Sequence, residues 1–321
     1  MFKIITLKTM HELGHEMLKE AGCEVYTSKG ETEEEFIKEI RDLAVDGIFC
    51  RTDKVTKAMM DASPNLKVIA KQGVGIDNID MDYATEKGIQ VVYAPGGNSN
   101  AVAEHTILLM LMCAVRYRYV DHVMRDEKNF EVRYDLEHTY ELKGKTLGLL
   151  GCGRIGQMVA KIAANGFGMN IIGYDPFPPR NPIVPIQMME KDEVLAKADF
   201  ISLHMPSLPT TKHSIGYDDF CKMKPTAIFV NCARGDVIVE EDLVRVLNEG
   251  KILGAGLDVF DQEPLSFDNP LLGLNNVVAT PHTAATTVQS VENCTRMACE
   301  SIIEVLRGEN VTYPANKITK K

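Results

Sequence analysis

The chain has 321 residues, of which 45% are hydrophobic and 25% are charged. At about 150 residues per domain this length predicts two domains, and the composition excludes a disordered, collagen-like or coiled-coil protein. The 35 basic and 45 acidic residues give a formal net charge of −10. Such a surface repels phosphate backbones and anionic lipid, so neither a nucleic-acid partner nor a membrane is expected.

The lack of a targeting signal and the spacing of the cysteines predict a cytoplasmic protein. The longest apolar run, residues 107–115, has nine residues, whereas a helix needs about 20 to cross a bilayer. The N-terminus has lysines on both sides of a short apolar core and lacks the apolar region of a signal peptide. The 8 cysteines contain no Cys-x-x-Cys pair and predict buried free thiols instead of a disulfide framework.

Short β-rich runs alternate with helical stretches along almost the whole chain. Amphipathic segments at 33–41, 154–165 and 240–248 are predicted helices. This alternation predicts parallel sheets with helices on both faces. The predicted strands are 2–7, 46–50, 66–70, 89–92, 146–150, 170–174, 200–203, 227–231, 252–258 and 277–279.

A dense cluster of helix and strand breakers, residues 94–98, marks the predicted domain boundary. A predicted helix over 99–125 follows, long enough to bridge two lobes, and the last helix, 287–306, is suited to return to the first lobe. The predicted fold is therefore α/β, with two doubly wound parallel-sheet domains of the Rossmann or flavodoxin type and a cleft between them. Residues 1–98 plus 287–321 form the predicted substrate-binding domain, and residues 99–286 form the predicted nucleotide-binding domain.

The strongest motif is Gly151-Cys152-Gly153-Arg154-Ile155-Gly156, which follows a predicted strand and opens a predicted helix. The first glycine permits a tight turn, the second a close approach to a pyrophosphate, and the third close packing of helix and strand. Backbone N–H groups at the helix N-terminus bind phosphate. Asp175 follows the next strand, where a carboxylate binds the adenosine ribose hydroxyls and repels a 2′-phosphate. The motif predicts NAD in preference to NADP, although Arg180 lies nearby.

A second glycine pair, Gly73-Val74-Gly75, follows another predicted strand but has Asn78 where a third glycine would stand. Two glycines can still form a nest of backbone N–H groups that binds an anion. Arg51 and Lys71 each follow a predicted strand and flank this loop. Together these residues predict a site for an anionic group of the substrate.

Three polar side chains lie just beyond the carboxyl ends of later strands, where open α/β sheets bind ligands. They are Arg234, Glu263 and His282. The guanidinium can bind a carboxylate and polarise a keto oxygen, and the histidine can protonate the developing alkoxide. The glutamate can orient the imidazole. These residue types suit the reduction of a 2-keto acid.

Several stretches, taken together, are specific for one known family. They are 73–80, 97–104, 151–156 with Asp175, 231–235, 257–260 with 263–264, and 281–282. On these stretches the chain resembles the D-isomer-specific 2-hydroxyacid dehydrogenases. The resemblance implies an NAD-dependent oxidoreductase that transfers a hydride between nicotinamide and C2 of a 2-hydroxy or 2-keto acid, with Arg234, Glu263 and His282 as catalytic residues. It also implies a homodimer formed through the cofactor domain.

The expected ligand contacts combine the motifs with this resemblance, and no metal is expected. The expected substrate contacts are Arg51, Lys71, Gly73, Val74, Gly75 and Arg234. The expected cofactor contacts are Gly151, Gly153, Arg154, Ile155, Gly156, Asp175, Cys232, Ala233, Arg234, Asp258, His282 and Ala285.

The substrate is the least determined point. Arg51, Lys71 and Arg133, the last of which could come from a partner subunit, are more cations than a monoanion needs and indicate a second anionic group. Within the family this resembles 3-phosphoglycerate dehydrogenases, here without the C-terminal regulatory domain that some carry, because the chain ends soon after Leu306. A hydroxypyruvate or glyoxylate reductase is the alternative. An NAD-sensing corepressor, in which binding matters more than turnover, is an alternative of another class.

Two histidine patterns compete with this interpretation. Residues 11–15 spell H-E-x-x-H, the motif of zinc peptidases, but the predicted helix is short, contains a glycine and lacks a third ligand downstream. His204 also ends a predicted strand and competes with His282 for the acid–base role, but it has no neighbouring Glu-Pro. We therefore expect neither zinc chemistry nor catalysis by His204.

Overall fold

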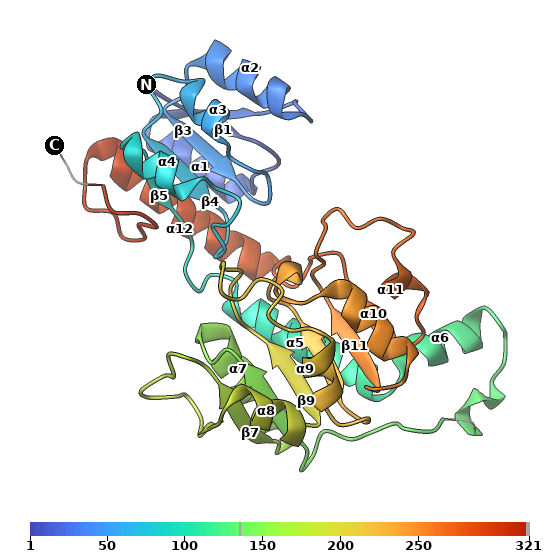
Figure 1. Ribbon diagram of the computed structural model, residues 1–321. Coiled ribbons are helices and arrows are strands. Elements are labelled where there is room, and N and C mark those ends of the chain that lie inside the picture. The colour runs from blue at the N-terminus through green and yellow to red at the C-terminus, as the bar shows by residue number, and fades with distance from the viewer. Residues whose placement is uncertain (135, 319–321) are drawn as a thin grey trace. The chain divides into compact units, whose positions relative to one another are not determined.

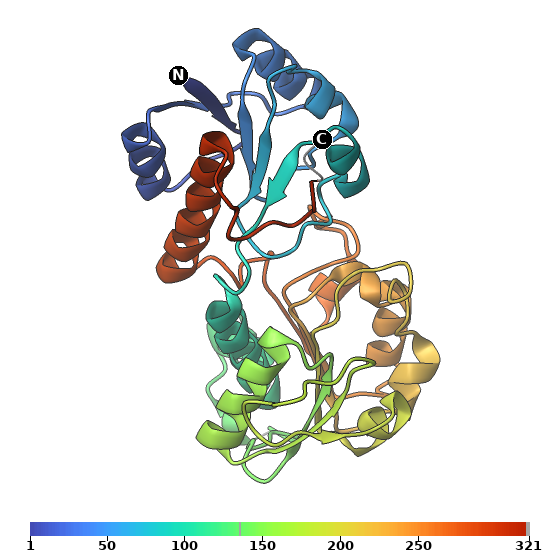
Figure 2. The same ribbon diagram turned by 90° about the vertical axis from the view of Figure 1, so that its left-hand side faces the viewer.

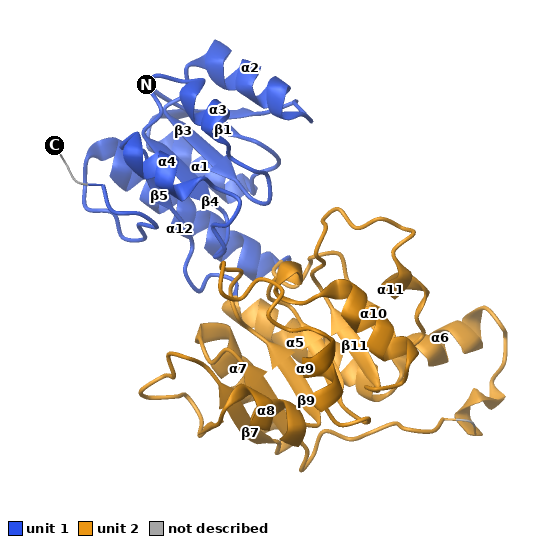
Figure 3. Cartoon of the chain, in the orientation of Figure 1, with its two compact units in different colours: residues 1–98, 286–321 blue, residues 99–285 orange. Residues whose placement is uncertain are grey.

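Two compact units make up the chain: residues 1–98 with 286–321, and residues 99–285 (Figure 3). The structure is a computed structural model that describes residues 1–134 and 136–318, so residues 319–321 of the predicted first domain lie outside the described residues. Each unit has its own parallel sheet with helices packed on both faces (Figures 1 and 2). The predicted fold class, two doubly wound parallel-sheet domains, is confirmed.

Unit 1, residues 1–98 and 286–321, contains a five-stranded parallel sheet in the order β2-β1-β3-β4-β5. This is the flavodoxin-like order, whose switch point lies between β1 and β3. The strands are β1 (Phe2–Thr6), β2 (Cys23–Thr27), β3 (Gly47–Cys50), β4 (Val68–Lys71) and β5 (Gln90–Val92). The helices are α1 (Glu12–Glu20), α2 (Glu33–Leu43), α3 (Lys57–Asp61), α4 (Met81–Glu86) and α12 (Val288–Arg307).

Alternating side chains of the unit 1 strands bury two cores. Ile4 and Phe49 pack on one face with residues of α1 and α12. Ile5 and Ile48 pack on the other face with residues of α2, α3 and α4. Every residue of β3 and β4 is buried, as expected of strands covered on both faces.

Unit 2, residues 99–285, contains a seven-stranded parallel sheet in the order β12-β11-β10-β9-β6-β7-β8. This is the Rossmann order extended by one strand, and its switch point lies between β6 and β9. The strands are β6 (Thr146–Leu150), β7 (Asn170–Tyr174), β8 (Gln187–Met188), β9 (Phe200–Leu203), β10 (Ile228–Asn231), β11 (Gly254–Leu257) and β12 (Val277–Ala279). The helices are α5 (Ser99–Ala114), α6 (Tyr117–Arg125), α7 (Arg154–Phe167), α8 (Lys191–Lys197), α9 (Tyr217–Lys222), α10 (Glu240–Asn248) and α11 (Pro270–Gly273).

The single helix predicted over 99–125 is wrong, because two helices occupy this stretch. Arg116, between α5 and α6, has a φ of +55°, and its N–H donates to the carbonyl of Cys113 at 3.1 Å. This left-handed residue ends α5 and redirects the chain. The helices also differ in environment: α5 packs on α7 and on β10 and β11, whereas Val123 is the buried residue of α6. The buried residues of the apolar run 107–115 therefore belong to the core of unit 2, and they are Ile107, Leu109, Met110, Cys113 and Ala114. None of the helices over the described residues is both long enough and apolar enough to span a membrane.

Candidate active site

The glycine-rich loop lies at the switch point of the unit 2 sheet. Gly151 has a φ of +99°, and a Cβ atom there would lie 2.7 Å from the carbonyl oxygen of His204, which follows β9. A Cβ on Gly156 would lie 2.4 Å from the carbonyl oxygen of Gly151. Among the described residues nothing lies within 4 Å of a Cβ built on Gly153. Two glycines therefore let the turn close, and the third leaves open backbone at the start of α7.

The start of α7 and Asp175 fit the two ends of an adenosine diphosphate. Gly153 is the N-cap of α7 and has no side chain to satisfy the first N–H groups, which can therefore bind phosphate. The Asp175 carboxylate accepts hydrogen bonds from the N–H of Cys152 at 2.7 Å and of Phe177 at 2.8 Å. These bonds hold the carboxylate beside the glycine loop and leave further lone pairs for ribose hydroxyls. The residues present fit NAD.

His282 and Glu263 form a hydrogen-bonded ion pair. His282 Nδ1 lies 2.6 Å from Glu263 Oε2, and Glu263 Oε1 accepts from the N–H of Phe260 at 3.1 Å. Burial raises the pKa of the Glu263 carboxyl, but the hydrogen bond and charge of His282, with the N–H of Phe260 and the charge of Arg234, together outweigh it and hold that pKa below its ordinary value of 4.5. The two side chains are 38% and 35% exposed. With Nδ1 facing the carboxylate, Nε2 is the nitrogen that can exchange a proton with a small molecule.

Arg234 follows β10 and joins this pair. Its charge is one of the influences that lower the pKa of Glu263. The fully buried Asn231 fixes the turn, because its side chain donates to the carbonyl of Arg234 at 2.9 Å and accepts from the N–H of Ala233 at 2.9 Å. The structure thus brings the three predicted catalytic residues into one cluster within unit 2.

The remaining predicted cofactor residues also lie in unit 2, in different environments. Arg154 is exposed in the first turn of α7, and Ile155 is partly buried beside it. Cys232 is buried, and this burial raises the pKa of its thiol to about 12. Asp258 is 1% exposed and accepts hydrogen bonds from its neighbours in the loop that carries His282. Ala285 lies in the same loop and is partly buried.

His204 is a weaker acid–base candidate than His282. Its Nε2 lies 2.9 Å from the hydroxyl of the buried Ser202, and burial lowers the pKa of the imidazole to about 4. A histidine with that pKa is neutral near pH 7 and gains no stabilisation of its charged form from a carboxylate partner.

The predicted substrate residues of unit 1 lie at the carboxyl ends of β3 and β4, where Arg51 follows β3 and Lys71 is the last residue of β4. Lys71 is 9% exposed, and its ammonium donates to the carbonyl of Arg51 and, at 2.8 Å, to the side chain of Asn78. Arg51 itself is exposed. The Lys71 charge therefore stabilises the loop in which it is buried, whereas the Arg51 guanidinium is accessible to a ligand.

Asn78, which the sequence analysis noted only as the missing third glycine, joins the loops of this site. Its side chain accepts from Lys71 and donates to the carbonyl of Asp53 at 2.6 Å. The N–H of Gly73 donates to the carbonyl of Lys71 at 2.9 Å, so it is used within the loop. In the described part of the chain the N–H groups of Val74 and Gly75 have no protein acceptor. These two N–H groups are the ones available for an anion.

The competing zinc motif has a structural explanation. His11 is the N-cap of α1, where its Nδ1 accepts from the N–H of Leu13 at 3.3 Å. Gly14 is buried, and a Cβ there would lie 2.8 Å from the side chain of Thr295.

Of the 8 cysteines, seven are buried free thiols, as predicted, and Cys221 is exposed.

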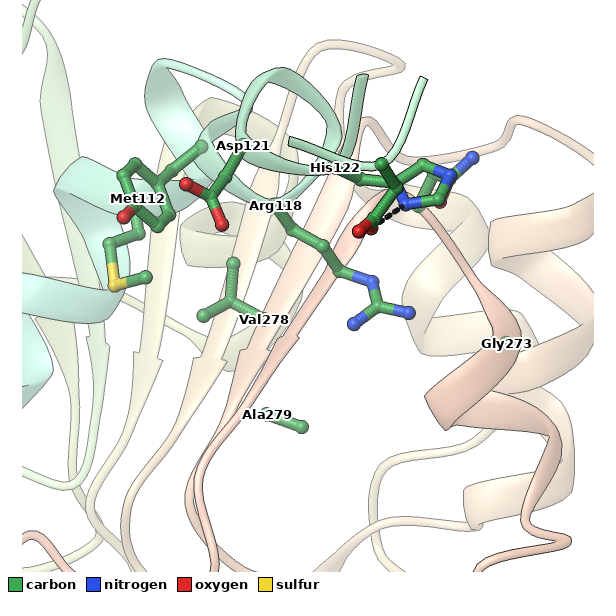
Figure 4. A pocket seen from close by; sticks show the side chains of 10 residues that line it. Met112, Arg118, Asp121, His122, Gly273, Val278 and Ala279 are labelled. Atoms are coloured by element: carbon green, nitrogen blue, oxygen red, sulfur yellow. Dashed lines mark hydrogen bonds and ion pairs between the residues drawn. The ribbon is translucent and has the colours of Figure 1, made fainter. Parts of the chain in front are cut away.

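A cavity of about 600 Å³ lies elsewhere on unit 2, beside α6 (Figure 4). Arg118 lines it and donates to the carbonyl of Leu272 at 2.6 Å and of Leu274 at 3.1 Å, and His122 lines it beside Asp126. None of the predicted catalytic, cofactor or substrate residues lines this cavity.

Comparison with known proteins gives the family. Residues 107–284 match the model of the D-isomer specific 2-hydroxyacid dehydrogenase, NAD binding domain. D-3-phosphoglycerate dehydrogenase of Methanocaldococcus jannaschii is 45% identical over 312 residues, covering 96% of this chain and 58% of that protein. Glyoxylate reductase of Thermofilum pendens is 39% identical over 326 residues, covering 98% and 94%. The chain belongs to the D-isomer specific 2-hydroxyacid dehydrogenase family. The family assignment made from the sequence is confirmed.

Solved structures agree with this assignment. NAD⁺-bound 3-phosphoglycerate dehydrogenase of Entamoeba histolytica has a TM-score of 0.82 and 30% identity, with 99% of both chains covered. Unit 2 contains the NAD-binding domain of the family, and the prediction of NAD as the cofactor is confirmed. The preference for NAD over NADP stays a prediction. The chain spans only 58% of the Methanocaldococcus jannaschii relative and 59% of the corresponding enzyme of Archaeoglobus fulgidus.

Replacing Glu263 with Gln should remove a stabilising contribution that depends on pH. Because the folded-state pKa of Glu263 lies below its ordinary value of 4.5, the ionised carboxylate stabilises the fold above that value, and the contribution is lost as the pH falls through the folded-state pKa. Urea unfolding should therefore show wild type more stable than Glu263→Gln at pH 7, and the difference should be smaller at pH 3. Glu309→Gln, on an exposed residue, is the control. A difference that is the same at both pH values would contradict the ion pair.

Proposed function

We propose that the protein is an NAD-dependent D-2-hydroxyacid dehydrogenase that transfers a hydride between nicotinamide and C2 of a 2-hydroxy or 2-keto carboxylate. The carrying observation is the 2.6 Å contact between His282 and Glu263, with Arg234 beside them, in the unit that contains the glycine loop. Unit 2 is the proposed NAD-binding domain, and unit 1 is the proposed substrate-binding domain.

The side chains divide the reaction among them. When bound, NAD supplies the acceptor or donor of the hydride. Arg234 binds the substrate carboxylate and polarises the oxygen on C2, because a guanidinium matches oxygen pairs in a bidentate manner. His282 gives a proton to that oxygen through Nε2 during reduction and removes it during oxidation. Glu263 holds the ring by Nδ1 and stabilises the imidazolium.

His282→Ala should lower kcat by about 10²–10⁴, the usual contribution of general acid–base catalysis. His204→Ala is the control and should cost less than about tenfold, because its ring donates no proton near pH 7. Steady-state NADH oxidation with a 2-keto acid measures both. Near-wild-type activity of His282→Ala would show that another residue is the general acid–base catalyst. Absence of turnover by wild type with every 2-keto acid would favour the NAD-sensing alternative.

We further propose 3-phosphoglycerate, with phosphohydroxypyruvate as its oxidised partner, as the substrate. The exposed Arg51 and the N–H groups of Val74 and Gly75 provide a cation and two donors for a second anionic group. Relatives named D-3-phosphoglycerate dehydrogenase are 45% and 37% identical to this chain. Hydroxypyruvate or glyoxylate reduction is the second candidate, since the chain covers 94% of a glyoxylate reductase.

A panel of 2-keto acids with and without a 3-phosphate separates these candidates. The phosphate proposal expects kcat/KM for phosphohydroxypyruvate at least about tenfold above that for hydroxypyruvate. Arg51→Ala should remove most of that ratio, and Arg41→Ala, an exposed arginine on α2, should leave it in place. A kcat/KM for hydroxypyruvate or glyoxylate equal to or above that for phosphohydroxypyruvate would establish the second candidate.

Cofactor preference depends on Asp175. Its carboxylate should repel the 2′-phosphate of NADP, so Asp175→Ala should raise the NADPH/NADH ratio of kcat/KM by about tenfold or more. Arg180→Ala removes an exposed arginine five residues further along the chain and should leave the ratio within about twofold. Equal use of NADPH by wild type would contradict the argument from Asp175.

We also propose that the protein forms a homodimer through residues 108–134 of unit 2. Large apolar side chains are exposed over this stretch, with Phe130 63% and Tyr134 71% exposed. Arg133 stacks on both rings, at 4.8 and 4.5 Å from their centroids. Aromatic and arginine side chains are typical of the centres of protein interfaces. The other exposed apolar residues of this stretch are Leu108, Val115, Tyr117 and Met124.

Phe130→Asp with Met124→Asp should convert the dimer to a monomer, because two charges would be buried in the interface. Light scattering coupled to size-exclusion chromatography measures the mass. Phe267→Asp is the control, since Phe267 is 95% exposed and lies outside this stretch. A wild-type mass of one chain at micromolar concentration would refute the dimer.

A further inference from the structure

The loop that carries His282 is held in a conformation that few residues other than glycine adopt. His282 has a φ of +51°, and such a residue persists only where its surroundings fix it. Its N–H donates to the carbonyl of Asp258 at 2.8 Å. The next two N–H groups, of Thr283 and Ala284, donate to the Asp258 carboxylate at 2.8 and 2.9 Å. Three consecutive N–H groups of the loop therefore donate hydrogen bonds to one residue, Asp258.

Side-chain hydroxyls reach the same carboxylate, and that of Thr283 does so at 3.4 Å. The hydroxyl of Thr280, just after β12, donates to Asp258 Oδ1 at 2.6 Å. Since that proton is committed, Thr280 Oγ1 must accept from His105 Nε2, which lies 2.9 Å away. His105 Nε2 is also 3.5 Å from Asp258 Oδ1. The hydrogen bonds therefore run in one direction, from His105 on α5 through Thr280 to Asp258.

This chain of hydrogen bonds is buried, so Asp258 depends on protein donors. Asp258 is 1% exposed, and the His105 side chain is 15% exposed. A buried carboxylate depends on its donors, because water does not replace one that is lost. Removal of the Thr280 hydroxyl or of the His105 imidazole should therefore weaken the hydrogen bonds by which Asp258 holds the loop. The alignment of His282 with Glu263, across 2.6 Å, depends on that loop.

We propose that His105 and Thr280 are positioning residues that act through Asp258 to hold His282 in its working orientation. Neither residue is required to touch substrate. The catalytic part of this inference rests on the proposed function, whereas the effect on the loop rests on the hydrogen bonds alone. We expect a lower kcat with little change in KM for the 2-keto acid, because Arg234, which binds the substrate carboxylate, lies on a different loop.

Two pairs of variants test the proposal. Thr280→Val keeps the shape of the side chain and removes the hydroxyl, and Thr280→Ser restores it. His105→Ala removes the donor, and His105→Gln places an N–H near the position of Nε2. Hydrogen–deuterium exchange followed by mass spectrometry reports the N–H groups of residues 282–284 directly and needs no substrate. Steady-state kinetics on the same proteins gives kcat and KM.

Thr280→Val and His105→Ala should each accelerate exchange at residues 282–284 by about tenfold or more. They should also lower kcat by a similar factor and leave KM for the 2-keto acid within about threefold of wild type. Thr280→Ser and His105→Gln should restore both quantities to within about threefold of wild type. Unchanged exchange at residues 282–284 in both removal variants overturns the proposal. Acceleration of equal size throughout unit 2 also overturns it, because it shows general destabilisation. If wild type reduces no 2-keto acid, the proposed function fails, and the exchange data still decide this inference.

Discussion

Parallel pairing of the strands is the constraint on which the rest of the structure depends. When neighbouring strands run in one direction, all their carboxyl ends meet at one edge of the sheet, and the loops that follow them come together. In unit 2 this brings the turns after β6, β9, β10, β11 and β12 to the same edge, so residues up to 131 positions apart in the chain, from Gly151 to His282, share it. In unit 1 it places Arg51 just after β3 and Lys71 at the end of the adjacent β4.

Buried polar groups convert this shared edge into defined geometry. Asn231 fixes the turn that carries Arg234, and Asp258 fixes the loop that carries His282. In unit 1 the side chain of Asn78 plays a similar part by joining Lys71 to the loop at Asp53. Asn231 and Asp258 are buried and Asn78 is partly buried, and each of them pairs with backbone or side-chain groups of its loops. The exposed residues of the site are thus oriented by neighbours that need not touch a ligand.

Electrostatics separates the two histidines that compete for the acid–base role. Both follow strands of unit 2, but Glu263 lies 2.6 Å from His282, whereas His204 faces a serine hydroxyl. A carboxylate partner stabilises an imidazolium, and burial without one favours the neutral ring. Burial of the ring lowers the pKa of His204, whereas His282 is partly exposed and has a carboxylate partner, although both residues follow strands of the same sheet.

The sequence alone determined the fold class, the family, the glycine loop and the candidate residues at strand ends, because strand–helix alternation and motif spacing are local patterns. It missed β2 and β8, edge strands with little buried surface, and it merged α5 with α6 because helical periodicity does not report a single left-handed residue at Arg116. The burial of Lys71, the role of Asn78 and the hydrogen bonds from His105 to Asp258 were decided only by tertiary structure. These contacts join residues that are distant in the chain, as His105 and Thr280 are by 175 positions, and no local pattern encodes which of them meet.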